Sequence, residues 1–240
     1  MPISVLSTAS VGVLDVLRSR FKERCLASEN RFQNWQIRVH RSLSWLDRAF
    51  ELDPEQQPDG RLLFDWVAFN ALYGRWDERE GFPAPDTLAW KDFLRRAFKV
   101  DQGGLLAARL TERREDILKL AENKYLDPRF WQNPSEPGNL RRRYFEATAL
   151  FFEKRWLDLA ILTIERIYVL RGQLVHGAAT RGTRLNRETL EQSLVLLEQL
   201  LLPMLEVVVE KLADDDWPTL CYPPLGDTVP AGSILPARPR

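Results

Sequence analysis

Residues 157–176 read Leu157-Asp-Leu-Ala-Ile-Leu-Thr-Ile-Glu-Arg-Ile-Tyr-Val-Leu-Arg-Gly-Gln-Leu-Val-His176, and this stretch decides the fold. A helix drawn through residues 157–175 carries apolar side chains on nearly every side, which is typical of a helix buried at the centre of a domain. Gly177 follows His176 directly and suits the left-handed backbone position with which many helices end. The stretch therefore predicts a central buried helix that ends at His176.

Other long segments repeat apolar residues at intervals of three and four, and no run alternates as a β-strand would. We therefore expect an all-α fold. Helices are expected over residues 29–52, 61–76, 87–98, 104–125, 144–175 with an interruption, and 187–212. Pro203 is expected to kink the last of them. The helices within 87–125 are amphipathic with charged outer faces, so we expect them at the outside of the bundle.

The chain of 240 residues is long enough to bury a full core, and we interpret it as one helical domain with two appendages. The domain covers residues 29–212 and follows an N-terminal segment, 1–28. Residues 213–240 turn acidic and then proline-rich without periodicity, which predicts an extended or disordered tail.

No membrane insertion is expected, because no window reaches the roughly 18 uninterrupted apolar residues of a membrane span. The apolar run at 11–17 lacks a basic region before it and is a poor signal peptide. Cys25 and Cys221 lack the spacing of a metal site or a redox pair and fit a reducing compartment. We therefore expect a cytoplasmic protein without a structural disulfide or a metal.

Charge is distributed unevenly along the chain although its totals balance. Lys plus Arg and Asp plus Glu both number 34, so the whole protein has no net attraction for nucleic acid or for an anionic membrane. Residues 138–187 nevertheless hold ten basic residues against four acidic ones, whereas 188–216 hold eight acidic residues against Lys211 alone. Arg181 and Arg184 follow the central helix among small residues, as in a phosphate-binding rim. The alternative is a solvated loop whose arginines pair with the acidic last helix.

Arg171 and His176 are the strongest candidates for chemistry. His176 is one of only two histidines, and imidazole can give or take a proton near neutral pH. An unpaired arginine on so apolar a helix is costly, so Arg171 should face an anion, either a carboxylate such as Asp65 or a ligand phosphate. Residues five apart differ by about 140° and about 7.5 Å on an ideal helix, yet both side chains can reach one phosphate from a fraying helix end. The structural alternative is that Arg171 pairs with a buried carboxylate and His176 caps the helix.

The Arg-x4-His pattern lies near the end of an apolar helix and is followed by a small-residue loop and one more amphipathic helix. This arrangement resembles the HEPN superfamily of α-helical proteins. The stretch Phe64-Asp-Trp-Val-Ala-Phe-Asn-Ala-Leu-Tyr-Gly-Arg-Trp76 also looks like the second helix of bacterial HEPN proteins of this size. The similarity covers roughly residues 30–212, with 87–125 as an insertion or extension. It implies an antiparallel helical bundle of HEPN type with extra helices inserted and an extended C-terminal tail.

Many HEPN proteins are metal-independent endoribonucleases of toxin–antitoxin, phage-defence or RNA-processing systems. The resemblance therefore implies RNA as substrate, no cofactor, and a homodimer in which two Arg-x4-His motifs face one another across a cleft. His176 would act as general base on a ribose 2′-hydroxyl or as general acid on the leaving 5′-oxygen, while Arg171 stabilises the charge on the phosphorane. An antitoxin or a nucleotidyltransferase is the kind of partner protein that the resemblance implies.

One residue departs from the catalytic pattern. Many catalytic members have Asn, Asp or His after the arginine, whereas this chain has Gly172. Polar support is then expected from Gln173 or Asn70, although Asn70 could equally be a buried amide that bonds a neighbouring helix. Arg75 would add a second phosphate contact or lie as an ordinary surface arginine. Two other functions stay open: a non-catalytic HEPN-like dimer that binds RNA, a nucleotide or a protein, and a scaffold in which both motif residues are purely structural.

Overall fold

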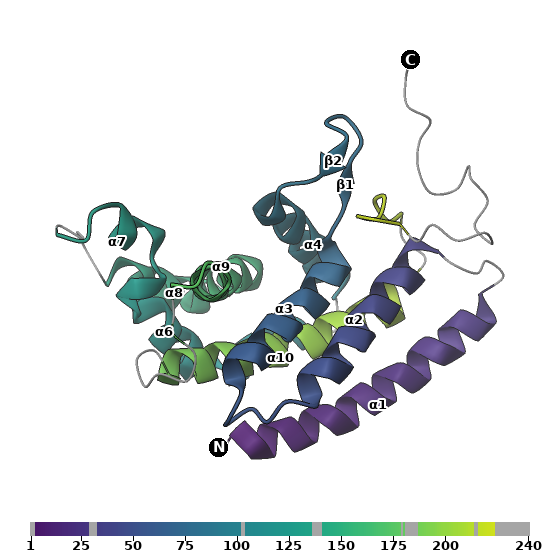
Figure 1. Cartoon of the computed structure of the whole chain (residues 1–240), viewed down its shortest axis with the longest axis horizontal. Coiled ribbons are helices and arrows are strands. Elements are labelled where there is room, and N and C mark those ends of the chain that lie inside the picture. The colour runs from purple at the N-terminus through teal and green to yellow at the C-terminus, as the bar shows by residue number, and fades with distance from the viewer. Residues whose placement is uncertain are drawn as a thin grey trace.

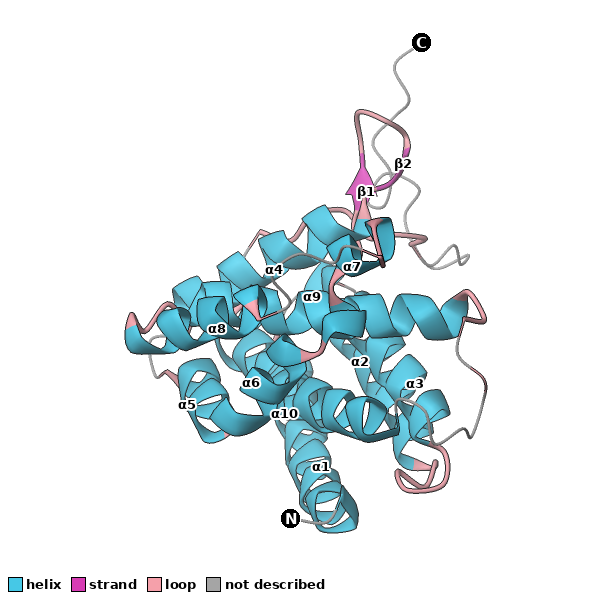
Figure 2. Ribbon diagram, turned by 90° about the vertical axis from the view of Figure 1, so that its left-hand side faces the viewer, coloured by secondary structure: helices cyan, strands magenta, loops and turns pink. Residues whose placement is uncertain are grey.

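The expectation of an all-α fold is confirmed by a computed structural model, which describes residues 3–28, 33–101, 104–135, 141–178, 180, 187–213 and 216–223. The described part also contains a small antiparallel hairpin, β1 (Trp76–Asp77) and β2 (Phe82–Pro83), which projects from the helical body in Figure 2. In chain order the helices of Figure 1 are α1 (Ile3–Ala27), α2 (Asn34–Phe50), α3 (Pro58–Tyr73), α4 (Asp86–Val100), α5 (Leu105–Glu112), α6 (Arg114–Glu122), the 3-10 turn η1 (Lys124–Leu126), α7 (Pro128–Gln132), α8 (Arg142–Phe152), α9 (Trp156–Val175) and α10 (Arg187–Lys211).

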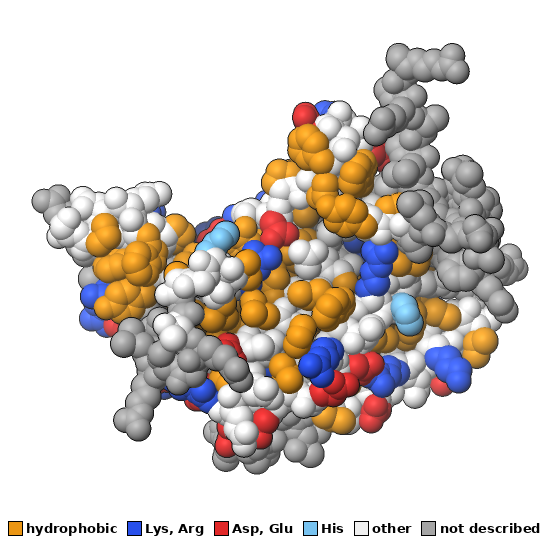
Figure 3. Space-filling model, viewed as in Figure 1, with side chains coloured by type: hydrophobic (Ala, Val, Ile, Leu, Met, Phe, Trp, Pro, Cys, Tyr) orange, Lys and Arg blue, Asp and Glu red, His pale blue; other side chains and the backbone are white. Residues whose placement is uncertain are grey.

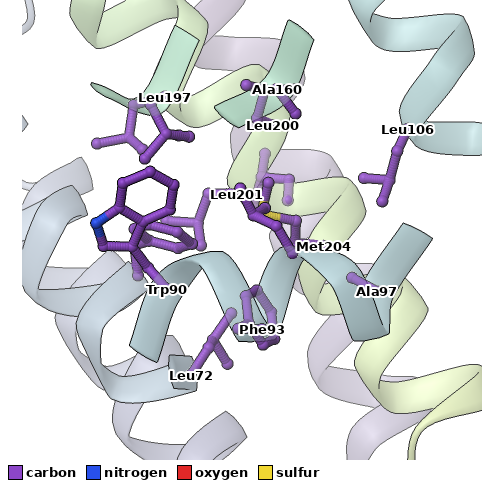
Figure 4. Close-up of a cluster of buried hydrophobic side chains, with 14 of the residues drawn as sticks. Leu72, Trp90, Phe93, Ala97, Leu106, Ala160, Leu197, Leu200, Leu201 and Met204 are labelled. Atoms are coloured by element: carbon purple, nitrogen blue, oxygen red, sulfur yellow. The ribbon is translucent and has the colours of Figure 1, made fainter. Parts of the chain in front are cut away.

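Helix α10 is the central helix of the core. It spans the molecule in Figure 1 and contacts α1, α2, α3, α4, α5, α6 and α9. Burying a large apolar side chain contributes about 1.5–3 kcal/mol, so this central layer supplies much of the stability. The helices within 87–125, expected at the outside, contribute to it because their apolar faces meet α10 while their charged faces reach solvent. Figure 4 shows the cluster, with Leu197, Leu200, Leu201 and Met204 of α10 near Trp90, Phe93 and Ala97 of α4, Leu72 of α3, Leu106 of α5 and Ala160 of α9.

Helix α9 is buried as predicted as far as Leu170, whereas its last turn leaves the core. Within the described residues, α10 is the one helix long and apolar enough to cross a membrane, with a mean hydropathy of 1.6. Of that apolar window, 83% is buried inside the fold, and a buried core helix passes the same test. Helix α10 also continues through Pro203 without a break.

Several helix boundaries differ from the predicted ones for local reasons. Helix α3 begins at Pro58 rather than at residue 61, because proline suits the first turn of a helix. The segment expected as one helix over 104–125 forms three pieces, α5, α6 and η1. The interruption expected within 144–175 lies between α8 and α9, where Lys154 adopts a φ of 53°.

The N-terminal segment forms a helix that the sequence pattern did not reveal. Leu14 and Leu17 of α1 are buried in the core, and α1 contacts α2 and α10. Phe21 packs edge-on against Trp35 of α2, with ring centroids 5.8 Å apart. Val13, on the other hand, is exposed, so apolar residues occur on more than one face and obscure the helical period. Residues 1–28 are therefore largely part of the bundle.

Residues 216–223 belong to the fold rather than to an extended tail. Trp217 is only 8% exposed. Arg38 of α2 is fully buried, and its guanidinium donates hydrogen bonds to the carbonyls of Gly74 and Pro218. The expectation of a free tail from residue 213 does not hold at its start, because the Pro218 carbonyl accepts from Arg38 of α2 and the Trp217 ring packs against Phe93 of α4. The proline-rich remainder lies outside the described residues.

Candidate functional site

Arg171 is a half-buried cation without an anion. It lies near the end of α9, with its guanidinium carbon 5.7 Å from the ring centroid of Trp66 and 5.8 Å from that of Tyr168. Among the residues that the structure describes, Arg171 has neither an ion pair nor a hydrogen bond. Contact with an aromatic face contributes only about 0.5–1 kcal/mol at a partly exposed position, so it compensates the charge incompletely.

Asp65, which we considered as the carboxylate facing Arg171, belongs to a separate cluster. It is fully buried beside Arg61 and Glu198, and Arg61 Nε donates to Glu198 Oε1 at 2.6 Å. Burial, reinforced by the Glu198 carboxylate, raises the pKa of Asp65 well above its ordinary value of 3.8. Asp65 thus keeps its proton beyond the pH at which an exposed aspartate ionises. Of the two candidate anions for Arg171, Asp65 is thus engaged elsewhere, because its charged neighbours are Arg61 of α3 and Glu198 of α10.

Arg171 lines a pocket of about 470 Å³ between α9, α2, α3, the hairpin, the first turn of α4 and residues 220–222. Figure 3 views this side of the molecule and shows hydrophobic side chains gathered across its middle, with Lys and Arg among them. Trp45 is 40% exposed, so part of the apolar surface is open to a ligand. The lining includes two further predicted site residues, Asn70 and Arg75, and the aromatic residues Trp45, Trp66 and Tyr222.

Asn70 forms a hydrogen bond with Asp86, which lies at the start of α4. Its Nδ2 donates to Asp86 Oδ1 at 3.4 Å, and the hydroxyl of Tyr73 donates to the same oxygen at 2.9 Å. Burial and the neighbouring Asp86 carboxylate raise the pKa of Tyr73, which therefore stays a donor. Asn70 therefore bonds a neighbouring helix, as in the alternative interpretation, although its side chain is half-buried rather than buried. Asp86 itself was missed, although an aspartate directly after Pro85 at a helix start is a visible feature of the sequence.

The other arginines of the pocket have partners. Arg75 Nη2 lies 3.2 Å from Asp92 Oδ2, and the side chain of Arg75 is 25% exposed. Arg41 donates to the carbonyl oxygens of Cys221 and Tyr222. Arg75 is therefore neither an ordinary exposed arginine nor a free phosphate contact, since a carboxylate already offsets its charge. Arg171 is the lining arginine that has neither a hydrogen bond nor an ion pair with a described residue.

His176 lies at the end of α9 and is exposed. The prediction for Gly177 is confirmed: its φ is 69°, and the backbone closes the helix through Gly177 N to Leu174 O (3.2 Å) and Ala178 N to Gln173 O (2.8 Å). These two bonds form a Schellman motif, so the backbone satisfies the end of the helix. Within the described chain, the imidazole has no hydrogen-bond partner. The histidine ring therefore remains available.

Gln173 does not support Arg171. Its Nε2 donates to the carbonyl of Tyr125 at 2.9 Å and ties α9 to η1. On a helix Gln173 and His176 lie about 60° apart, whereas Arg171 and His176 lie about 140° apart. His176 accordingly does not line the pocket that Arg171 lines. The structure brings Arg171, Asn70 and Arg75 together and leaves Gln173 and His176 outside.

Two predicted site residues, Arg181 and Arg184, lie outside the described residues. Across the described ranges, no group of three or more His, Cys, Asp or Glu side chains could hold a metal ion.

No protein-family model matches the chain, and neither a curated protein nor a solved structure matches it. The HEPN type of the bundle therefore stays a prediction from the Arg-x4-His and Phe64–Trp76 stretches. The function has to be argued from the pocket and from the end of α9.

Proposed function

We propose that the protein binds RNA and cleaves it without a metal, with Arg171 and His176 as the reacting pair in a homodimer. The observation that carries this proposal is that neither side chain has a hydrogen bond or an ion pair with a described residue. Arg171 is half-buried with no anion among the described residues, and His176 is exposed with no hydrogen-bond partner there. A guanidinium in this state favours a phosphate, which its planar donors bind in bidentate fashion.

The pocket favours RNA over an isolated phosphate ion. Exposed Trp45 and Tyr222 offer faces on which a base can stack, and they line the same pocket as Arg171. Single-stranded nucleic acids bind to such combinations of aromatic surface and cation. Unstacked bases of RNA are the usual targets of this mode of recognition.

The reaction requires only the groups of the pair. His176 takes the proton of a ribose 2′-hydroxyl, and the 2′-oxygen attacks the adjacent phosphorus. The P–O5′ bond breaks, and the 5′-oxygen takes up the proton from the protonated His176, which restores the neutral imidazole. Arg171 stabilises the negative charge on the phosphorane. The products are a 2′,3′-cyclic phosphate and a 5′-hydroxyl. Because the two side chains diverge by about 140° within one protomer, we propose that Arg171 of one copy and His176 of the other act on one phosphate.

The test is cleavage of a labelled RNA in EDTA by the wild type and by His176→Ala and Arg171→Ala proteins. Loss of a general acid or base lowers the rate by about 100- to 10,000-fold, so both variants should be nearly inactive. His40→Ala is the matched control for histidine, since His40 is the other histidine of the chain. Arg114→Ala is the control for arginine, because Arg114 also lies over an aromatic ring, that of Phe151, at 5.7 Å.

Cutting by the wild type and both controls, with a cyclic phosphate as product, would support the proposal. Full activity of His176→Ala would refute it. The rates are compared only between proteins of equal thermal stability.

A second candidate is a dimer that binds RNA and does not cut it. Two observations favour it: Gly172 stands where many catalytic relatives of the motif have a polar residue, and His176 lies outside the pocket. In that case the wild type would bind RNA and leave it intact, and Arg171→Ala alone would weaken binding.

The metal-independent ribonuclease that we propose as the first function would suit a toxin–antitoxin or phage-defence system.

A further inference from the structure

The pocket holds a carboxylate with one oxygen free. Asp86 Oδ1 accepts hydrogen bonds from Tyr73 and Asn70, whereas Oδ2 accepts none from the described residues. Asp86 is in the first turn of α4, at the positive end of the helix dipole. A carboxylate in an RNA-binding pocket repels phosphate, so it must serve another part of the nucleotide.

Unused donors lie beside the same pocket. Trp66 is 1% exposed, and its indole Nε1 is buried without a hydrogen-bond partner. Arg171 is the second unused donor, and its guanidinium lies over the Trp66 ring. Trp66 Nε1 is closed off from the pocket, whereas the half-exposed guanidinium of Arg171 can reach an acceptor on a ligand. The pocket is therefore complementary to a ligand that has both hydrogen-bond donors and acceptors.

We propose that this pocket receives a nucleobase of the bound RNA and selects guanine through Asp86. Guanine presents two neighbouring donors, N1–H and the N2 amino group, beside the acceptor O6. The free Oδ2 of Asp86 has two lone pairs and can accept from both donors, whereas adenine, cytosine and uracil each place an acceptor next to their single donor group. Acidic side chains read base amino groups in this way. The inference rests on the proposed function only in taking the ligand to be RNA.

The size and walls of the pocket fit a base. Its volume of about 470 Å³ lies within the usual range for small-molecule sites, about 300–1,000 Å³. Trp45 and Tyr222 supply aromatic surface beside the polar groups. Gly74 leaves room for the Asn70 side chain in its present position. A Cβ at residue 74 would lie 3.0 Å from both the backbone oxygen and Oδ1 of Asn70. Asn70 is thus a positioning residue for Asp86.

The test is calorimetric binding of 5′-GMP, 5′-AMP, 5′-CMP and 5′-UMP to the full chain. GMP should bind about tenfold more tightly than the others, because a well-placed pair of hydrogen bonds to a base gives discrimination of this order. Asp86→Asn should lose about tenfold in GMP affinity and gain affinity for 5′-XMP. In xanthine a carbonyl replaces the N2 amino group, and the new amide can donate to it.

Asp158→Asn is the matched control. Asp158 also lies in the first turn of a helix, α9, and it pairs with Arg155. It therefore loses the same interaction with the helix dipole without touching the pocket. This variant should keep the preference for GMP.

Equal binding of the four nucleotides, no binding of any, or an Asp86→Asn protein that keeps its GMP affinity would overturn the inference. These outcomes are separable from RNA cleavage. A GMP preference without cleavage would leave the base pocket and remove the nuclease, while His176-dependent cleavage without base preference would do the reverse.

Discussion

Two arginines of this molecule, Arg61 and Arg171, have opposite surroundings. Arg61 is fully buried, and its Nε donates to Glu198 Oε1 at 2.6 Å, with the guanidinium 4.5 Å from the ring centroid of Phe50. Arg171 has aromatic rings beside it but no carboxylate among the described residues. The buried charge of Arg61 is thus compensated by a carboxylate of the fold. Arg171 lines the pocket with neither an anion nor a hydrogen-bond acceptor among the described residues, so we interpret it as a place for a ligand.

The largest effect is expected from removing both carboxyl groups beside Arg61. A protein with both Glu198→Gln and Asp65→Asn leaves a buried guanidinium without any counter-charge, which should cost about 3–5 kcal/mol of unfolding free energy. Urea unfolding measures this loss. Glu198→Gln alone should cost less, because Asp65 can then give up its proton and replace the lost charge. Equal losses in the single and double variants would show that Asp65 does not compensate.

A smaller loss is expected at Arg38, a buried arginine that is satisfied by carbonyl groups rather than by a carboxylate. Arg38→Leu leaves the acceptors of Leu72, Gly74 and Pro218 without their donor. Each unsatisfied buried group costs about 1–3 kcal/mol, and hydration after the segment detaches limits the total to about 2–3 kcal/mol. Limited proteolysis should then cut within 216–223. Protection equal to that of the wild type would show that this segment does not depend on Arg38.

The pH dependence of stability should sharpen the contrast further. The pKa of Asp65 is raised in the folded state, so above about pH 4 the unfolded chain loses this proton while the folded protein keeps it. Folding is then penalised as pH rises, by up to about 1.4 kcal/mol per unit until the folded group ionises. Asp65→Asn removes this slope. Urea unfolding at several pH values should show that the unfolding free energy of the variant rises relative to that of the wild type as pH increases. The same pH dependence in both proteins would contradict the raised pKa of Asp65.

The smallest effect is expected at Arg171. Arg171→Ala removes contacts with two aromatic rings and no ion pair among the described residues, so stability should fall by only about 0.5–1 kcal/mol. RNA binding should nevertheless fall steeply. Thermal unfolding and RNA titration of the same preparation test the two readouts together. A loss of stability comparable to that at Arg61 would mean that Arg171 is structural.

The part of the fold set by local pattern could be predicted from the sequence. The apolar surface of α9, its end at His176 and the left-handed Gly177 follow from neighbouring residues, and the structure has all three. Helix α1 and residues 216–223 could not be predicted, because their burial depends on distant partners. Arg38 and Pro218, for example, are 180 residues apart.

The site was predictable to a similar extent. A charge on an apolar helix drew attention to Arg171, and Asn70 was suspected for the same physical reason. Their meeting with Asp86 depends on how α4 packs against α3, which residue spacing does not show. The divergence of Arg171 and His176, in contrast, was already implied by five helical steps of 100° each, about 140° in all.

The pocket wall formed by residues 220–222 has a consequence for when the protein can act. These residues leave the ribosome after α10, so a growing chain can collapse its core around that helix while the pocket still lacks a side. The wall closes only when Arg38 and Arg41 have engaged the carbonyl groups of the later segment. The pocket that we propose for RNA would thus be completed after the helical core.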